Sequence, residues 1–345
     1  MIGSSKGSLP GKSAVATCLS FAILIGMKAV TYDRFGGPEV LQISEVAEPV
    51  AGRGEVVVQV RAAAVNPMDW KIRSGRVSLL AGRKFPKRTG FDFAGIVESC
   101  GADVAGLKLG DEVFGETSPL NAKRGAFAEK CVTRAKLVAR KPAGVSFTEA
   151  AATPCAGLSA LQSLRQCKVG AGSRVLLIGA SGGLGIFAVP LAKQFGAHVT
   201  AVCSAHGIDL VKRLGADVVI DRQKENPLAQ GPVYDAVLDL AAMHYFAECR
   251  HMLTPRGYYL NTMPGTGAIW SQCWTALFSA QKARVLLLSP STAGFAELGD
   301  LMASGTLRPL VSRVFSFDDE SVREMHRLSQ DGHVLGKLVL ELPVR

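Results

Sequence analysis

The amino-acid sequence predicts an α/β protein in which a doubly wound parallel sheet is inserted into a β-rich domain. Before residue 147 the chain consists of short strands separated by glycine and proline, which is typical of a compact rolled or barrel-like domain. Apolar strands then alternate with helical segments as far as residue 288, as in a parallel sheet covered on both faces. The remaining residues return to the first pattern, so we expect the β-rich domain to be discontinuous in the chain.

The length and composition agree with two globular domains. The chain has 345 residues, of which 48% are hydrophobic and 20% are charged. The predicted bounds are 1–26 for an N-terminal extension, 27–149 and 290–345 for the two segments of the β-rich domain, and 150–289 for the inserted domain.

In the β-rich segments, the first strand begins at Met27 and ends in a turn at Gly36, Gly37 and Pro38. Alternating apolar residues predict further strands at 55–64, 94–99, 112–115 and 126–133, then at 310–315 and 337–342. Helices are expected at 295–303 and 319–328.

In the inserted domain, Ser146 or Thr148 can cap a helix that runs through the sequence EAAATPCAGLSALQSL. Strands are expected at 174–178, 198–202, 217–220, 234–240, 257–261 and 284–288, with helices at 184–194, 208–214 and 245–253.

The N-terminal extension contains Lys6 and Lys12 in front of an apolar stretch at 13–26. This stretch is shorter than the roughly 20 apolar residues that span a bilayer. We therefore expect no firm membrane span and a cytoplasmic protein whose first domain begins at Met27. The alternative is a protein that residues 1–26 target elsewhere or attach peripherally to a membrane.

Charge and cysteine spacing exclude several classes of protein. The formal net charge is +10, but the Lys and Arg residues are scattered rather than clustered, which disfavours a nucleic-acid partner. None of the eight cysteines forms a C-x-x-C pair, so neither a disulfide framework nor a zinc ribbon is expected.

The strongest local signal is the glycine-rich segment GASGGLG at Gly179–Gly185. It follows a predicted strand and opens a predicted helix, which is the context of a dinucleotide-binding loop. Gly182 and Gly183 allow the backbone to approach a pyrophosphate, and Gly185 allows the helix to pack closely on the sheet. The free N–H groups of the helix N-terminus then face the phosphates.

The next strand indicates which dinucleotide is bound. NAD-specific sites place an acidic residue about 20 residues further on, where it binds the ribose hydroxyls. Here the strand at 198–202 is followed by Cys203 and Ser204, and no acidic residue occurs before Asp209. Ser204 and Arg222 can instead donate hydrogen bonds to a 2′-phosphate, so the sequence predicts NADPH as the cofactor.

Several motifs together resemble the medium-chain dehydrogenase/reductase superfamily. They are MKAVTYDRFGGPEVL at the start, AAAVNPMDWKIRSG at 62–75, FDFAGIVESCG at 91–101, GDEVFG at 110–115, GAFAEK at 125–130, the glycine loop, HVTAVCS, LGADVVID and DGHVLGKLVLEL. In this order they are most similar to the zinc-lacking quinone oxidoreductase branch. The resemblance implies a Rossmann nucleotide domain inserted in a GroES-like catalytic domain.

The resemblance also implies that there is no metal site. Asn66 stands where the zinc alcohol dehydrogenases of the superfamily have a catalytic Cys, and Phe91 and Asp92 replace their His-Glu pair. Only Cys100 lies in the region of the structural zinc lobe. Without a Lewis acid, hydride transfer to a conjugated acceptor is favoured over oxidation of a simple alcohol.

The resemblance assigns roles to particular residues. Asn66 and Lys71 are the candidate catalytic residues, although Lys71 replaces a more usual Tyr and water is an alternative proton donor. Gly336 and Lys337 resemble a strand near the cofactor cleft, but a core β-strand explains them equally well. The candidate cofactor-binding residues are Ser181, Gly182, Gly183, Leu184 and Gly185 at the pyrophosphate, Ser204 and Arg222 at the 2′-phosphate, Ala241 near the ribose, and Leu260, Asn261 and Thr262 beside the nicotinamide.

The predicted function is NADPH-dependent reduction of a small electrophile, either a quinone or the activated C=C of an enal, enone or enoyl compound. The alternatives are a noncatalytic NADPH-binding or scaffold protein and a zinc-independent alcohol dehydrogenase-like enzyme. The resemblance further implies a homodimer, formed through the outer strand near 285–288.

Overall fold

The computed structural model describes Gly3 and residues 26–118 and 124–343. Apart from Gly3 and Gly26, the predicted N-terminal extension lies outside the described residues. Within the described ranges no helix combines the length and apolar character needed to cross a membrane.

The inserted segment forms a six-stranded sheet in which every neighbouring pair is parallel. The strand order is β11-β10-β9-β12-β13-β14. The order reverses between β9 and β12, and ligands of such sheets bind where the strand order reverses. The strands are β9 (Arg174–Ile178), β10 (His198–Cys203), β11 (Val218–Asp221), β12 (Tyr234–Asp239), β13 (Leu253–Asn261) and β14 (Lys282–Val285).

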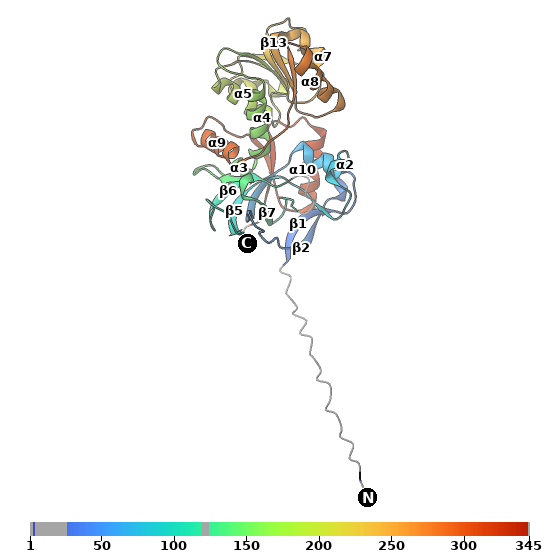
Figure 1. Ribbon diagram of the computed structural model, residues 1–345, viewed down its shortest axis with the longest axis vertical. Helices are drawn as coiled ribbons and strands as arrows, with labels where there is room; N and C mark the ends of the chain where they lie inside the picture. The colour runs from blue at the N-terminus through green and yellow to red at the C-terminus, as the bar shows by residue number, and fades with distance from the viewer. Residues whose placement is uncertain (1–2, 4–25, 119–123, 344–345) are drawn as a thin grey trace.

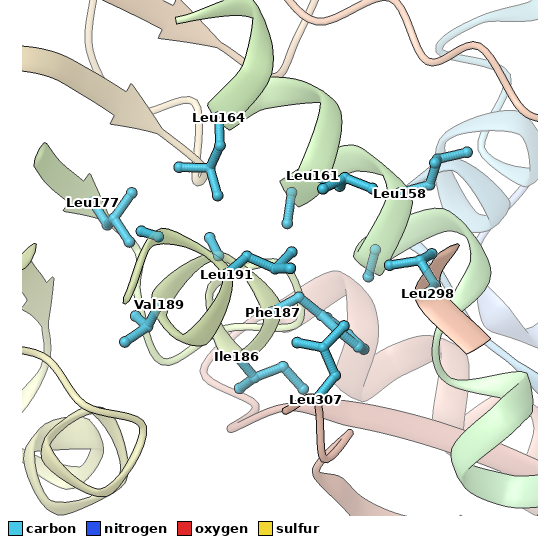
Figure 2. Close-up of a cluster of buried hydrophobic side chains, with 14 of the residues drawn as sticks. Leu158, Leu161, Leu164, Leu177, Ile186, Phe187, Val189, Leu191, Leu298 and Leu307 are labelled. Carbon is cyan, nitrogen blue, oxygen red and sulfur yellow. The ribbon is translucent and has the colours of Figure 1, made fainter. Parts of the chain in front are cut away.

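Helices join these strands and cover the sheet. They are α4 (Pro154–Gln166), α5 (Gly185–Gln194), α6 (Ile208–Arg213), α7 (Phe246–Cys249) and α8 (Thr266–Phe278). Figure 2 shows the core beneath two of them, where leucines of α4 face Ile186, Phe187 and Leu191 of α5. Leu298 of α9 (Thr292–Ala303) joins the same cluster, so the core continues toward the second domain.

The two flanking segments together build the β-rich domain below the parallel sheet (Figure 1). One sheet has the order β15-β16-β3-β5-β6-β8 with β7 paired to β3, and a smaller sheet has the order β2-β1-β4. The strands are β1 (Gly26–Tyr32), β2 (Gln42–Ala47), β3 (Glu55–Ala64), β4 (Lys87–Arg88), β5 (Asp92–Cys100), β6 (Glu112–Glu116), β7 (Lys130–Arg134), β8 (Val138–Arg140), β15 (Val311–Phe315) and β16 (Lys337–Glu341). The helices are α1 (Pro67–Arg73), α2 (Ser78–Ala81), α3 (Phe147–Ala151), α9 and α10 (Asp319–Asp331).

Strand β16 connects the end of the chain to its beginning. It pairs antiparallel with β3, with Val339 opposite Ala64 and Leu340 opposite Ala63. The chain therefore leaves the β-rich domain, forms the parallel sheet and returns to complete the sheet that contains β3. The change of strand and helix pattern along the sequence predicted this order.

The structure differs from the predicted elements in several places. The single helix expected after Ser146 is divided into α3 and α4, because Pro154 has no N–H to continue the first helix and instead begins the second. The strand expected at 126–133 is shorter and forms β7, while the last strand of the parallel sheet begins earlier, as β14. Residues 266–278, for which no helix was predicted, form α8.

Candidate active site

A cavity of about 340 Å³ lies between the two domains. The parallel sheet contributes the glycine loop and the ends of β9, β10 and β12, which is the edge where the strand order reverses. The β-rich domain contributes the segment before α1 and the residues leading into β16. Of the residues predicted from the sequence, eight line this cavity: Asn66, Ser181, Gly182, Gly183, Leu184, Ser204, Arg222 and Ala241.

The glycine loop is shaped by close backbone packing. Gly179 has a φ of +85°, which a residue with a side chain rarely adopts, and a Cβ there would lie 3.0 Å from the Cβ of Ala241. At Gly185 a Cβ would lie only 2.2 Å from the carbonyl oxygen of Ala180. Gly185 therefore does not line the cavity but lets the first turn of α5 approach the end of β9.

The amides at the start of α5 can bind an anion. In the described part of the chain, no carbonyl accepts a hydrogen bond from the N–H of Gly183 or Leu184. Both residues line the cavity, and the positive end of the helix dipole lies at the same place. A Cβ at Gly183 would lie 3.2 Å from Cδ of Lys337, so that lysine approaches the phosphate-binding loop from the opposite domain.

At the end of β10, three polar side chains line the cavity together. Ser204 Oγ lies 3.2 Å from a ring nitrogen of His206, and Arg222 is held by a bond from its backbone N–H to the carbonyl of Cys203. The Arg222 guanidinium lies 3.5 Å from Sδ of Met243, which also lines the cavity. Asp221, which precedes Arg222 in the chain, is buried and is not among the lining residues.

At the other end of the cavity, a buried lysine positions Asn66. Lys337 Nζ donates to Asn66 Oδ1 at 2.6 Å and to the carbonyl of Val65 at 3.0 Å. Asn66 Nδ2 donates to Asp92 Oδ2 at 2.9 Å. All three side chains are at most 4% exposed. Their bonds fix the Asn66 amide in one orientation and leave its second N–H hydrogen available to a ligand.

Three buried carboxyl groups belong to this network or interact with it: Asp92, Asp69 and Glu116. Burial raises the pKa of Asp92 to about 6, although Lys337 and the bonds from Asn66 and Cys155 oppose the increase. Burial also raises the pKa of Asp69 to about 7 and that of Glu116 to about 8, and the charge of Asp92 adds to both shifts. Asp69 accepts bonds from the backbone N–H groups of Asn66 and Gly90, so it holds the turn before α1 in place.

The structure does not bring Lys71 to the wall of this cavity. Its Nζ donates to Sδ of Met263 at 2.9 Å and lies 5.4 Å from the centroid of the Trp70 ring. Burial lowers the pKa of Lys71, and the nearby Arg76 charge adds to the decrease. The two candidate catalytic residues are therefore separated, and only Asn66 faces the cavity.

The segment at the end of β13 is also outside the cavity wall. Leu260 is fully buried in the hydrophobic core, which explains why its side chain cannot contact a ligand. Asn261 Nδ2 donates to the carbonyl of His244, and its Oδ1 accepts from the N–H of Met263. The Thr262 hydroxyl donates to the carbonyls of Asp239 and Leu240. These polar groups stabilise the turn rather than face the cavity.

Two of the polar residues that line the cavity, His206 and Lys337, are used in the functional argument below but were not predicted as site residues. His206 was not predicted because it lies four residues beyond the strand at 198–202 that was used to judge cofactor specificity. Lys337 was noticed, but an apolar strand around it fitted a core position equally well. A lysine within the apolar sequence LGKLVLEL was a usable signal, since a buried lysine is rare without a specific partner.

Two family models match parts of the chain. The family model described as "Alcohol dehydrogenase GroES-like domain" matches residues 52–143, and the model described as "Zinc-binding dehydrogenase" matches residues 214–340. Among the described residues, no group of three or more His, Cys, Asp or Glu side chains is arranged to hold a metal ion.

Individual relatives match nearly the whole chain. Quinone-oxidoreductase QR1 of Triphysaria versicolor is 36% identical, over 91% of this chain and 98% of the relative. The 2-methylene-furan-3-one reductase of Solanum lycopersicum is 32% identical, over 95% and 82%. The solved structure of the quinone oxidoreductase from Coxiella burnetii superposes with a TM-score of 0.85 at 33% identity, and covers 93% of this chain and 100% of that one.

The inserted parallel sheet, its glycine loop and the interdomain cavity define an oxidoreductase that uses a nicotinamide cofactor. The chain belongs to the medium-chain dehydrogenase/reductase superfamily, in its zinc-independent quinone oxidoreductase branch.

Proposed function

We propose that the protein transfers a hydride from NADPH to a quinone or to the activated C=C of an α,β-unsaturated carbonyl compound. The observation that carries this proposal is the composition of one cavity. A phosphate-binding helix terminus lies between a polar pocket at Ser204, His206 and Arg222 and an oriented amide at Asn66. The names of the relatives, a quinone oxidoreductase and a methylene-furanone reductase, support the same class of acceptor.

The polar pocket supports NADPH rather than NADH. Ser204 and His206 can donate hydrogen bonds to a 2′-phosphate, and Arg222 adds a permanent positive charge. An NAD-specific site would place a carboxylate there to bind the ribose hydroxyls, and this carboxylate would repel the phosphate. No Asp or Glu is among the residues that line the cavity.

Asn66, positioned by Lys337, would act on the acceptor. Bound NADPH would supply the hydride, and the reduction leaves negative charge on the oxygen of a quinone or enone. The second N–H of Asn66 can donate to that oxygen, because Lys337 and Asp92 already fix the amide. Donors that are oriented before the reaction stabilise such charge without the cost of reorganisation.

The product also needs a proton. Lys71 donates to Met263 away from the cavity wall, so we infer that water entering the cavity supplies this proton. The balance is then one hydride from the cofactor and one proton from solvent for each molecule of acceptor reduced.

The direct test is NADPH oxidation by the purified full chain with a panel of 2-alkenals, enones and naphthoquinones. We expect oxidation with at least one class, and a slower rate with NADH. The variant Leu109→Gln, at an exposed position of the β-rich domain, is the matched control and should react at the parent rate. NADPH binding in calorimetry without oxidation by any acceptor would assign the chain a noncatalytic role.

A further inference from the structure

Helix α8 presents its polar residues to the protein and its large apolar residues to the outside. Only Thr275 of the helix is buried. Thr275 Oγ1 accepts a bond from the N–H of Ala283 at 2.9 Å, and Gln272 Oε1 accepts one from the N–H of Val285 at 2.7 Å. The inward face of α8 therefore covers the outer edge of β14 with polar contacts, on the outer flank of the parallel sheet (Figure 1).

The outward face is a continuous apolar surface, which we call the α8 strip. The rings of Trp270 and Trp274 stack with centroids 6.3 Å apart, and Phe278 follows 6.4 Å from Trp274. A water-soluble helix places such residues against the core, whereas here they face away from it. The strip consists of Ile269 (49% exposed), Trp270 (66%), Trp274 (36%), Leu277 (77%) and Phe278 (71%).

The segment of the chain that contains the strip carries charged residues of one sign only. No Asp or Glu occurs from Cys249 to Ala296, while this stretch contains Arg250, Arg256, Lys282 and Arg284. Lys282 lies at the C-terminal end of α8, where its Nζ donates to the carbonyls of Thr275 and Ser279. A second copy of the chain would bring the same positive charge against this surface, whereas an anionic lipid surface would attract it.

We propose that α8 docks the protein on a membrane surface that contains anionic lipids. Trp and Phe side chains favour the boundary between headgroups and acyl chains, and the flanking Arg and Lys residues favour the phosphates. The helix lies in the plane of the interface and does not cross the bilayer. This proposal does not depend on the acceptor that the enzyme reduces.

The test uses the full chain with vesicles made of phosphatidylglycerol and phosphatidylcholine in equal parts. Two of the three tryptophans lie on α8, so intrinsic fluorescence reports on this helix directly. We expect co-sedimentation with these vesicles, a blue shift of the emission, and quenching by lipids brominated on their acyl chains. Binding should weaken with added salt and with vesicles of phosphatidylcholine alone.

The double variant Ile269→Gln and Leu277→Gln removes apolar surface and keeps both tryptophans. We expect its vesicle binding to weaken by roughly tenfold or more, with thermal stability and NADPH binding unchanged. The matched control is Leu109→Gln, which replaces an equally exposed leucine (71%) of the other domain and should bind vesicles like the parent.

Three results would overturn the proposal. If the double variant binds vesicles as strongly as the parent, the binding belongs to another segment of the chain. Binding without quenching by brominated lipids would lead to the same conclusion. Self-association that shields the tryptophans in the absence of lipid, together with no uptake on vesicles, would assign the α8 strip to a second copy.

Discussion

Arg222 is the residue on which cofactor selectivity depends most directly. Its guanidinium lies at the polar end of the cavity, and the backbone bond to Cys203 fixes its position. In Arg222→Ala we expect the affinity for NADPH to fall by about 1.5–3 kcal/mol, because a charge-assisted bond to the 2′-phosphate is lost. The affinity for NADH should hardly change. Titration calorimetry of both cofactors measures the difference, and Arg213→Ala on the exposed surface of α6 is the control.

Lys337 should affect catalysis through Asn66. In Lys337→Met the Asn66 carbonyl oxygen loses its donor, so the amide is no longer held in one orientation. We expect kcat to fall by roughly 10- to 1000-fold with saturating NADPH. Loss of two buried hydrogen bonds should also lower the free energy of unfolding by about 1–3 kcal/mol. An unchanged kcat in a variant that is measurably less stable would limit Lys337 to a structural role.

Glu116 gives the protein a predictable dependence on pH. Its pKa is raised from 4.5 to about 8 by burial and by Asp92, so the folded state keeps a proton that the unfolded chain releases. Stability therefore falls as the pH rises from about 4.5 to about 8. Glu116→Gln removes this titrating group. We expect the free energy of unfolding of the variant to exceed that of the parent by on the order of 1–4 kcal/mol between about pH 5 and about pH 9. Denaturant unfolding at several pH values measures this difference in stability. The control is Glu225→Gln at an exposed position, which should show no such gain.

Two glycines at the start of α5 differ in the space around them. A Cβ at Gly185 would overlap the backbone of Ala180, whereas one at Gly182 would approach only the carbonyl of Gly179, at 3.4 Å. We expect Gly185→Ala to lower the free energy of unfolding by on the order of 2–4 kcal/mol and Gly182→Ala to have a much smaller effect. Equal stabilities of the two variants in thermal or denaturant unfolding would contradict this account of the close helix-to-strand approach.

The elements that the sequence predicted well are those with strong periodicity. The strands of the parallel sheet are continuous apolar runs, and the glycine loop has a fixed place between strand and helix, so both were found within a few residues. Helix α8 was missed because its apolar residues face outward and its polar residues face β14, which reverses the usual pattern. The polar network of Lys337 was not predictable from spacing, since Asn66 lies in the segment before α1, 271 residues away in the chain.

At the level of the whole molecule, the cofactor should hold the two domains together. The cavity walls come from both, so NADPH binds the assembled protein and not the unfolded chain. At about 100 times its Kd, NADPH should add about 2.7 kcal/mol to stability and raise Tm by roughly 3–6 °C. NADH at the same concentration should raise Tm by a smaller amount. Differential scanning calorimetry measures both shifts, and identical shifts would contradict the proposed selectivity.

Homodimerisation stays a prediction, and α8 restricts how it can occur. The outward N–H groups of Ala283 and Val285 already donate hydrogen bonds to α8. Two copies therefore cannot pair their β14 strands along 282–285. Of the predicted contact near 285–288, Leu287 is 67% exposed and remains accessible. Sedimentation equilibrium of the parent and of Leu287→Gln tests whether this position joins two copies; a stable monomer would contradict the prediction.

The pairing of β16 with β3 has a consequence for the newly made protein. The parallel-sheet domain is contiguous in the chain and can fold as soon as it leaves the ribosome, since domains generally fold as units during synthesis. The β-rich domain is completed later, because one of its inner strands, β16, follows the whole parallel-sheet domain in the chain. A growing chain can thus present the phosphate-binding loop before the lysine that orients Asn66 has been made, so the site is complete only after β16 has been made and has paired with β3.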